Sequence, residues 1–300
     1  MTNKTYDTII IGAGPAGITA AIYAKRYNME VALISKEFGG YMNEAPEIDN
    51  YPGFKQISGF ELQTKTREHL EYLQVEIIDE SAIQIEKSEN LFIIKTESNH
   101  VYAKSIIYAI GTKRRKLNVP GEDKFQGRGV SYCATCDGAF FKNKAVAVIG
   151  GGDSAAKAAM MLAEHCSKVY VIVKAKEMIA EPKNQEIITA NSKIQILTER
   201  DTKEIQGEKT VTKLITDKET LDVNGIFVEI GSYPDTKLLD NLDINKHKDG
   251  YILANELMET NIKGLFAAGD INKKPLKQII TACNDGAIAA YSAFGFVKKN

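Results

Sequence analysis

The pattern of apolar and polar positions near the start of the chain predicts a strand, a tight turn, a helix and a second strand. Residues Tyr6–Ile11 form a β-branched apolar run, which is typical of a buried strand. Three glycines follow within residues 12–17, and helical spacing then continues through Arg26. A second apolar run, Val31–Ser35, predicts the next strand. This order of elements is typical of a dinucleotide-binding unit.

Each glycine of this turn has its own physical role in such a unit. Gly12 permits the tight turn, Gly14 lets the backbone approach a pyrophosphate, and Gly17 lets the helix pack closely on the strand. The first turn of the helix presents N–H groups and the positive end of the helix dipole to the phosphates. An acidic residue about 20 residues further on normally binds the ribose. Glu37 has that spacing, although Ser35 holds the position at the strand end.

The same pattern returns in the middle of the chain. Ala145–Ile149 predicts a strand, and residues 150–155 begin with three consecutive glycines. A helix is then expected to run to about His165, and Lys168–Val173 predicts the following strand. Two such fingerprints, each flanked by strands and a helix, indicate two nucleotide-binding-like units. The alternative is a pair of glycine-rich turns that bind no ligand.

A third glycine element lies near the C-terminus. The short apolar strand expected within residues 264–269 ends at Asp270, whose carboxylate is suited to accept hydrogen bonds from sugar hydroxyls. Helical spacing resumes from Gln278 to Phe294. If this strand joins the first glycine unit, the first domain is discontinuous and the second is inserted into it.

The expected fold class is therefore α/β, with two doubly wound, Rossmann-like, three-layer domains. The first domain is expected at residues 1–115 and 244–300, and the inserted domain at 116–243. Two polar segments, 111–117 and 240–248, would suit hinges between them.

Composition and charge leave the expected fold unchanged and argue against a nucleic-acid-binding or membrane-spanning protein. The 300 residues carry 38 Lys and Arg against 39 Asp and Glu, a formal net charge of −1, which argues against a nucleic-acid-binding surface. No apolar run reaches the roughly 20 residues that a membrane span needs. No small-residue cleavage site follows the N-terminal apolar stretch. We therefore expect a cytoplasmic protein.

The number and spacing of the cysteines indicate a redox or metal site and not a scaffold of structural disulfides. Four cysteines in a chain of this length do not make a disulfide scaffold. Cys133 and Cys136 stand three apart, which in a reducing compartment indicates redox chemistry or half of a zinc site. The zinc hypothesis lacks a second Cys-x-x-Cys, because Cys166 and Cys283 stand alone. The four histidines are scattered, so no metal site is expected.

Four motifs together show which family this sequence resembles. GAGPAG near the start, CATCDG in the middle, GGGDSA shortly after it and FAAGDI near the end resemble the low-molecular-weight, FAD-containing thioredoxin reductases, in the same order and over nearly the whole chain. The resemblance implies FAD as cofactor, thioredoxin as partner, a homodimer, and an FAD domain split by the other domain. It also implies that FAD is contacted by Gly12, Gly14, Pro15, Ala16, Gly17, Glu37, Gly39, Gly40, Asn50, Gly111, Gly269, Asp270, Lys277, Gln278 and Ile279.

The resemblance also implies a role for the cysteine pair. Reduced flavin would pass two electrons to a Cys133–Cys136 disulfide, and the resulting dithiol would reduce a disulfide of thioredoxin. By resemblance, Cys136 faces the flavin and Cys133 attacks the partner. A free thiol with a pKa near about 8.5 is mostly protonated at neutral pH. Asp137, the next residue, is the expected proton carrier.

Two segments depart from the family pattern. NADPH-using members carry a His-Arg-Arg-x-x-x-Arg run after the second glycine unit, whose arginines grip the 2′-phosphate. Here Val173 stands at the histidine position, and Lys174, Ala175 and Ile179 stand at the arginine positions. Near the flavin, the family's Arg-Gln-Ala is replaced by residues 277–279, Lys-Gln-Ile, which keep a cation and an amide.

These departures favour a different electron donor. One branch of the family lacks the nucleotide motifs and takes electrons from ferredoxin, and the sequence resembles this pyridine-nucleotide-independent branch. Ferredoxins are acidic, and residues 142–193 hold eight Lys against five acidic residues, with four more cations at 113–116. Such a surface would suit an acidic protein.

Several alternatives stay open at this point. The protein could be an ordinary NADPH-dependent enzyme that uses Lys174 and Lys176 for the phosphate. NADH or a deazaflavin could be the donor. The acceptor could be a peroxiredoxin-like or glutaredoxin-like protein. The chain could also be a flavin-binding redox sensor without turnover.

Overall fold

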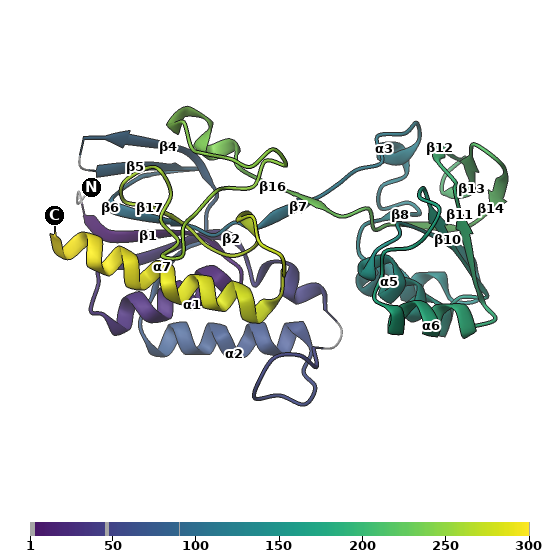
Figure 1. Ribbon diagram of the computed structural model, residues 1–300, viewed down its shortest axis with the longest axis horizontal. Coiled ribbons are helices and arrows are strands. Elements are labelled where there is room, and N and C mark those ends of the chain that lie inside the picture. Colours follow the sequence, from purple (N-terminus) through teal and green to yellow (C-terminus); the bar gives the residue numbers. More distant parts are fainter. Residues whose placement is uncertain (1–3, 46–47, 90, 300) are drawn as a thin grey trace. The chain divides into compact units, whose positions relative to one another are not determined.

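The chain folds into two compact units (Figure 1). Unit 1 holds residues 1–113 and 233–300, and unit 2 holds residues 114–232. Each unit contains a parallel or largely parallel sheet with helices packed against it. The expected fold class, α/β with two Rossmann-like domains of which the first is discontinuous, is therefore confirmed. The computed structural model describes residues 4–45, 48–89 and 91–299.

The sheet of unit 1 has the strand order β3-β2-β1-β6-β5-β4, and β17 also pairs with β6. In β1, which lies between β2 and β6, Thr8 pairs with Val31 on one side and with Ser105 on the other. All strand pairs of the sheet are parallel except β6 with β5 and β5 with β4. The strands are β1 (Thr5–Ala13), β2 (Val31–Phe38), β3 (Glu76–Ile78), β4 (Ala82–Ser88), β5 (Leu91–Thr96), β6 (His100–Tyr108) and β17 (Leu265–Ala267).

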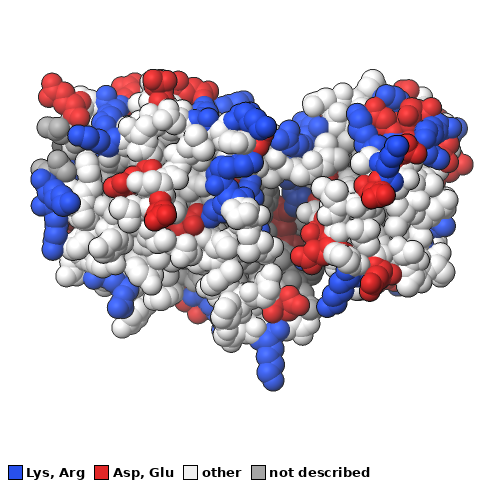
Figure 2. All heavy atoms as spheres, in the orientation of Figure 1, with Lys and Arg blue, Asp and Glu red and all other residues white. Residues whose placement is uncertain are grey.

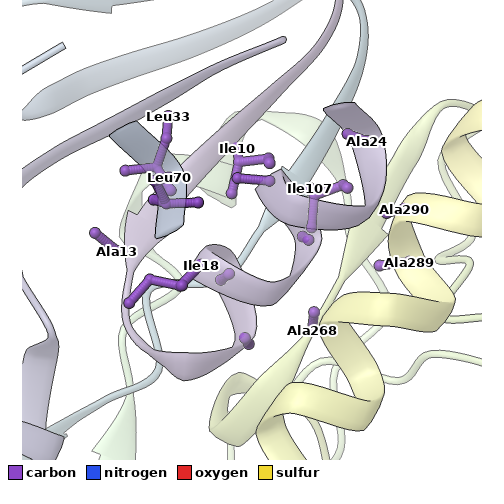
Figure 3. Packing of buried hydrophobic residues seen from close by; sticks show 14 of the residues in the cluster. Ile10, Ala13, Ile18, Ala24, Leu33, Leu70, Ile107, Ala268, Ala289 and Ala290 are labelled. Carbon is purple, nitrogen blue, oxygen red and sulfur yellow. The ribbon is translucent and has the colours of Figure 1, made fainter. Parts of the chain in front are cut away.

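Helices cover one face of this sheet. They are α1 (Pro15–Arg26), α2 (Gly59–Tyr72) and α7 (Ile279–Lys299). Ile10, Ile18 and Leu33 belong with Leu70 of α2 to one buried hydrophobic cluster between the sheet and the helices, part of which Figure 3 shows. The buried side of α1 is rich in alanine, so α7 approaches it closely. A Cβ on Gly286 of α7 would lie 2.0 Å from the carbonyl oxygen of Ala16.

The opposite face of the sheet is covered by the chain that follows the return from unit 2. This part includes η3 (Lys237–Leu242) and η4 (Gly269–Ile271), while η1 (Gly40–Glu44) follows β2. Leu239 is fully buried against the strands. The Asn241 side chain donates a hydrogen bond to Ile85 O at 2.9 Å, and the Tyr108 hydroxyl donates one to Asp235 O at 2.9 Å.

Because of these contacts, the second domain boundary lies earlier in the chain than the sequence predicts. The division falls at Tyr233, well before residue 244, because the segment in between packs on unit 1. The segment 240–248, expected to be a hinge, therefore lies within unit 1. The first crossing, after Lys113, lies inside the expected segment 111–117. At the two crossings, β7 (Thr112–Arg114) pairs with β16 (Ser232–Pro234).

The sheet of unit 2 is entirely parallel, with the order β11-β10-β9-β15-β8. Helices α5 and α6 pack on one face around Leu162 and Ile188. An antiparallel sheet, β12-β13-β14, covers the other face, and its Leu214 is fully buried. The elements are β8 (Val130–Ser131), β9 (Ala145–Ile149), α5 (Asp153–His165), β10 (Lys168–Val173), α6 (Pro182–Ala190), β11 (Ile194–Thr198), β12 (Thr202–Gly207), β13 (Val211–Thr216), β14 (Thr220–Asp222) and β15 (Gly225–Val228).

Short helices complete unit 2. They are α3 (Glu122–Phe125), α4 (Ala134–Asp137) and η2 (Gly138–Phe141), of which the last two join β8 to β9. Within the described ranges of the chain, no helix is both long and apolar enough to cross a membrane.

Candidate functional site

The turn between β1 and α1 is built around three glycines with different surroundings. Gly12 has a φ of +104°, and a Cβ there would lie 2.5 Å from the carbonyl oxygen of Ala109. A Cβ on Gly17 would lie 1.8 Å from the carbonyl oxygen of Gly12, so α1 packs directly on the turn. A Cβ on Gly14 would meet nothing within 4 Å. Steric contacts thus require glycine at 12 and 17 and leave room for a ligand at 14.

The N-terminus of α1 is suited to an anion. No side chain caps the helix, and its first turn carries no acidic residue. Pro15 occupies the first helical position, and the first internal bond joins Ile18 N–H to Gly14 O at 2.9 Å. The N–H groups at the start of a helix have no partner within the helix itself, so they can donate to a phosphate.

A cavity of about 880 Å³ opens in front of this turn, and all of its lining residues belong to unit 1. This volume is in the range of small-molecule and cofactor sites. The ends of β1 and β2 and the residues that follow β6 contribute to the wall, together with η1 and the start of α7. Of the residues expected to contact FAD, the wall includes Gly12, Gly14, Pro15, Ala16, Glu37, Gly40, Gly111, Gly269, Asp270, Lys277, Gln278 and Ile279.

The remaining residues expected to contact FAD support the wall from outside. Gly17 packs beneath the turn, as described above. Gly39 has a φ of +90°, and its N–H donates to Ala13 O at 2.8 Å, which holds the end of β2 beside the turn. The Asn50 side chain donates to Gln278 Oε1 at 3.2 Å. Asn50 is thus placed to orient a lining amide.

Sequence reasoning missed part of the cavity wall. Residues 80–82 follow β3, and Lys113 forms an ion pair with Asp235 across the two crossing strands. Lys237 and Leu238 also contribute to the wall. The position of residues 80–82 after a parallel strand was a usable signal, because ligands bind at the carboxyl ends of such strands. Asp235, Lys237 and Leu238 carry no local signal, since only the fold of the returning chain brings them here.

Asp270 is an acidic residue of the cavity wall. Burial raises the pKa of its carboxyl group, and the positive charges of Lys277 and Lys274 oppose that rise. Its Oδ1 is buried and has no hydrogen-bond partner among the described residues. A buried acceptor without a donor is costly. Asp270 therefore fits a ligand that supplies a hydroxyl donor, as the ribityl chain of FAD does.

The backbone beside Asp270 is fixed by a buried ion pair. Gly269 has a φ of +82°, and its N–H donates to Asp285 Oδ2 at 2.9 Å. The same carboxylate pairs with Lys274, and both side chains are largely buried.

The ammonium group of Lys277 lies 3.5 Å from the centre of the Tyr251 ring. The cation at position 277 is therefore retained at the cavity and held in place by a cation–π contact.

Unit 2 carries the redox candidate. Cys133 and Cys136 form a disulfide, which excludes the pair as zinc ligands in this state. No cluster of three or more His, Cys, Asp or Glu side chains suited to a metal occurs in the described part of the chain. Cys136 is exposed, and Cys133 and Asp137 are half-buried.

Hydrogen bonds at the start of α4 hold Cys133. Its Sγ accepts from the Cys136 N–H at 3.1 Å. Its own N–H donates to Ser131 Oγ at 3.0 Å, and the same hydroxyl donates back to Cys133 O at 3.2 Å. The Cys136 N–H is placed to stabilise a thiolate on Cys133 after reduction, since hydrogen bonding to the charged form favours that form.

The second glycine turn has the shape of a dinucleotide site but lacks the arginines at positions 174, 175 and 179. Gly150 packs tightly, with its Cβ position 2.2 Å from Glu229 O, whereas nothing lies within 4 Å of a Cβ on Gly152. Lys174 is exposed and pairs with Asp201 at 3.0 Å. Ile179 is 85% exposed.

Comparisons with known proteins agree with this architecture. The family profile described as pyridine nucleotide-disulphide oxidoreductase matches residues 6–286. Thioredoxin reductase of Bacillus subtilis (strain 168) is 40% identical over 304 residues, which cover 99% of this chain and 96% of that protein.

Solved structures give the same result. A Lactococcus lactis thioredoxin reductase (FR conformation) has a TM-score of 0.94 and 39% identity, and the match covers 98% of this chain and 100% of that one. A ferredoxin-flavin thioredoxin reductase from Clostridium acetobutylicum has a TM-score of 0.56 and 36% identity, with 99% of both chains covered. This chain belongs to the pyridine nucleotide-disulphide oxidoreductase family and, within it, to the FAD-dependent thioredoxin reductases.

Proposed function

We propose that this protein reduces the disulfide of thioredoxin through Cys133 and Cys136, with FAD held in the cavity of unit 1 and ferredoxin as the electron donor. The single observation that carries the dithiol role is the disulfide at the start of α4, with the Cys136 N–H directed at Cys133 Sγ. The observation that carries the choice of donor is the lack of arginine at positions 174, 175 and 179 beside an otherwise intact glycine turn.

The residues around the cavity suit FAD. The open position at Gly14 and the uncapped start of α1 would receive its pyrophosphate, and Asp270 would accept hydrogen bonds from its ribityl hydroxyls. Lys277 and Gln278 would supply a cation and an amide at the wall. Once bound and reduced, the flavin would supply the two electrons that a disulfide needs, and FAD can itself accept electrons one at a time.

The chemistry at the cysteines follows from their contacts. In the dithiol form, the Cys133 thiolate attacks one sulfur of the thioredoxin disulfide and forms a mixed disulfide. The Cys136 thiol then gives up its proton and attacks Cys133 Sγ, which restores the enzyme disulfide and releases both thioredoxin sulfurs as thiols. Asp137, adjacent to Cys136, is the proposed carrier of the proton.

The donor proposal rests on what surrounds the second glycine turn. A 2′-phosphate is normally held by arginine forks, which bind two oxygens at once. Here Val173 is buried, Ala175 has no polar side chain, and the exposed Ile179 is apolar. The cation Lys174 is held by Asp201. A ferredoxin-flavin thioredoxin reductase is among the similar structures, so a ferredoxin donor is compatible with this fold.

A row of lysines would suit an acidic donor. Lys144, Lys168 and Lys193 stand at the starts of β9, β10 and β11, which are adjacent parallel strands. They therefore lie along one edge of the sheet of unit 2. On the face that Figure 2 shows, however, acidic and basic side chains of unit 2 are mixed. Any electrostatic docking is therefore expected at the strand edge and not over the whole unit.

An NADPH-dependent thioredoxin reductase is the second candidate. The open position at Gly152 favours it, because a pyrophosphate could reach the backbone there. Lys174 and Lys176 would then have to replace the missing arginines.

Association into a homodimer stays a prediction. Exposed Tyr23 on α1 and Tyr291 on α7 offer apolar surface for it.

Anaerobic flavin reduction distinguishes the candidates. The purified holoprotein is mixed with reduced ferredoxin, NADPH or NADH, and the loss of flavin absorbance is followed. We expect rapid bleaching by reduced ferredoxin and none by micromolar NADPH. Fast bleaching by NADPH would refute the donor proposal and support the second candidate. Cys133→Ser is expected to keep FAD and to lose thioredoxin turnover; full turnover in that variant would refute the dithiol role, and a wild type that never turns over thioredoxin would indicate another acceptor or a sensor.

A further inference from the structure

A buried carboxylate lies close in sequence and in space to the redox turn and has no part in the chemistry above. Glu122 begins α3, and only 2% of its surface is exposed. Its Oε1 accepts from Leu117 N–H at 2.8 Å and from the Tyr132 hydroxyl at 2.6 Å, and its Oε2 accepts from Asn118 N–H at 2.7 Å. A carboxylate so removed from water is tolerated only where donors satisfy it, and here each oxygen has one or two.

These bonds fix the residue that precedes Cys133. Burial and the hydrogen bond to Glu122 raise the pKa of the Tyr132 hydroxyl far above its ordinary value, so the phenol remains a donor. Its ring packs partly buried against the core of unit 2. The Tyr132 side chain therefore anchors the backbone just before Cys133, and the Ser131 hydroxyl, one residue further back, anchors the Cys133 N–H and C=O.

The same carboxylate also holds the chain that comes from the first crossing. Leu117 and Asn118 follow β7, and Asn118 has a φ of +57°. A left-handed residue whose own N–H and whose preceding N–H both donate to one carboxylate forms a fixed corner. Glu122 thus joins this corner and the redox turn into one hydrogen-bonded group.

The geometry points to Glu122 as a positioning residue for the redox pair: through Tyr132 it holds Cys133 in the orientation in which its sulfur meets both Cys136 Sγ and the Cys136 N–H. This inference rests on the proposed function of Cys133 and Cys136. Its physical consequence concerns the dithiol form. If Cys133 is held, the two thiols stay close after reduction and reclose easily; if it is loosened, the dithiol gains freedom and the disulfide becomes less favoured.

The test is the exchange equilibrium in which the Cys133–Cys136 disulfide and two glutathione thiols give the dithiol and one glutathione disulfide. The holoprotein is equilibrated anaerobically in glutathione buffers of graded ratio, quenched with an alkylating reagent, and analysed by mass spectrometry of the peptide that contains both cysteines. Wild type is compared with Tyr132→Phe and Glu122→Gln. Tyr170→Phe is the matched control, because Tyr170 is a partly buried tyrosine of the same core cluster.

Tyr132→Phe removes one hydrogen bond and leaves Glu122 with both backbone donors. We expect it to shift the equilibrium toward the dithiol by about threefold to tenfold, the effect of one net hydrogen bond. Glu122→Gln is expected to shift it by about tenfold, which is roughly 30 mV for this couple. Tyr170→Phe is expected to leave it unchanged.

Two results would overturn the inference: an unchanged equilibrium in Tyr132→Phe, or an equal shift in Tyr170→Phe, which would show a general loss of packing. If Glu122→Gln fails to fold, the equilibrium measured for Tyr132→Phe still tests the positioning role. Full thioredoxin turnover in Cys133→Ser would instead refute the proposed redox function, so the two failures are distinguishable.

Discussion

Adding a single methyl group at either of two glycines in the first turn should have opposite effects on folding and on cofactor binding. Gly14 has a φ of −76° and a ψ of −179°, a conformation open to any residue, and a Cβ there meets nothing within 4 Å. Gly17 lies one helical turn further on, and a Cβ there would lie 1.8 Å from Gly12 O. Gly14→Ala should therefore fold and bind FAD poorly, whereas Gly17→Ala should fold poorly.

The magnitudes follow from these surroundings. In Gly14→Ala, the lower entropy of the unfolded chain stabilises by about 0.4–1 kcal/mol, and the poorer helix cap offsets this by a similar amount, so the stability of the apoprotein should change little. The methyl group occupies the space through which a pyrophosphate reaches the backbone. Loss of one hydrogen bond to a charged group costs about 1.5–3 kcal/mol, which weakens FAD binding about tenfold to a hundredfold. For Gly17→Ala, overpacking against backbone costs about 1–3 kcal/mol or more.

Thermal unfolding of the flavin-free protein and titration with FAD measure the two effects separately. Gly295→Ala is the matched control, because Gly295 lies in α7, outside the cavity wall, and a Cβ there also meets nothing within 4 Å. It should keep wild-type FAD affinity. The reasoning is refuted if Gly14→Ala binds FAD as tightly as wild type, or if it lowers apoprotein stability as much as Gly17→Ala does.

Two further predictions concern the other sites. Ala175→Arg combined with Ile179→Arg should allow NADPH to bleach the flavin and leave the rate with ferredoxin unchanged; a double variant that folds but still does not respond to NADPH would show that more than the arginines is missing. Because burial raises the pKa of Asp270, the native apoprotein holds that proton more strongly than the unfolded chain does, so stability should rise as the pH falls from neutral toward about 4. Asp270→Asn should remove this component of the pH dependence and raise apoprotein stability at pH 7, as measured by urea unfolding; an unchanged profile would contradict the assignment of a raised pKa.

The glycine turns could be predicted from sequence because their causes are local. Gly17 is required by the backbone of Gly12 in the same short unit, so spacing indicates it. The atoms that require glycine at 12 belong to Ala109 and Ile110, which follow the neighbouring strand β6, and there only the motif indicated it. The same holds for Cys133 and Cys136, which are close enough along the chain to bond within one turn. The departure at residues 173–179 is also visible without a structure, since it concerns which side chains are present.

The second domain boundary could not be predicted in this way. Residues 240–248 are polar and have the composition of a hinge, yet the chain rejoins unit 1 at Tyr233. The reason is Leu239, which is buried against strands far away in the sequence. The third layer of unit 2 is a similar case, because an antiparallel sheet covers a face where doubly wound folds usually have helices.

By itself, the sequence determined the two glycine units, the cysteine pair and the loss of the arginine cluster, because each depends on a short motif or on residue identity, and the order of the motifs indicated the discontinuous first domain. Only the tertiary structure decided that Asp235 reaches the cavity, that Asp285 holds the turn beside Asp270, and that Glu122 binds Tyr132. Each of these depends on which side chains end up buried together. A buried polar group is costly unless it has a hydrogen-bond partner, and in the folded protein that partner can come from a residue far away in the sequence. No local sequence pattern indicates such a pair.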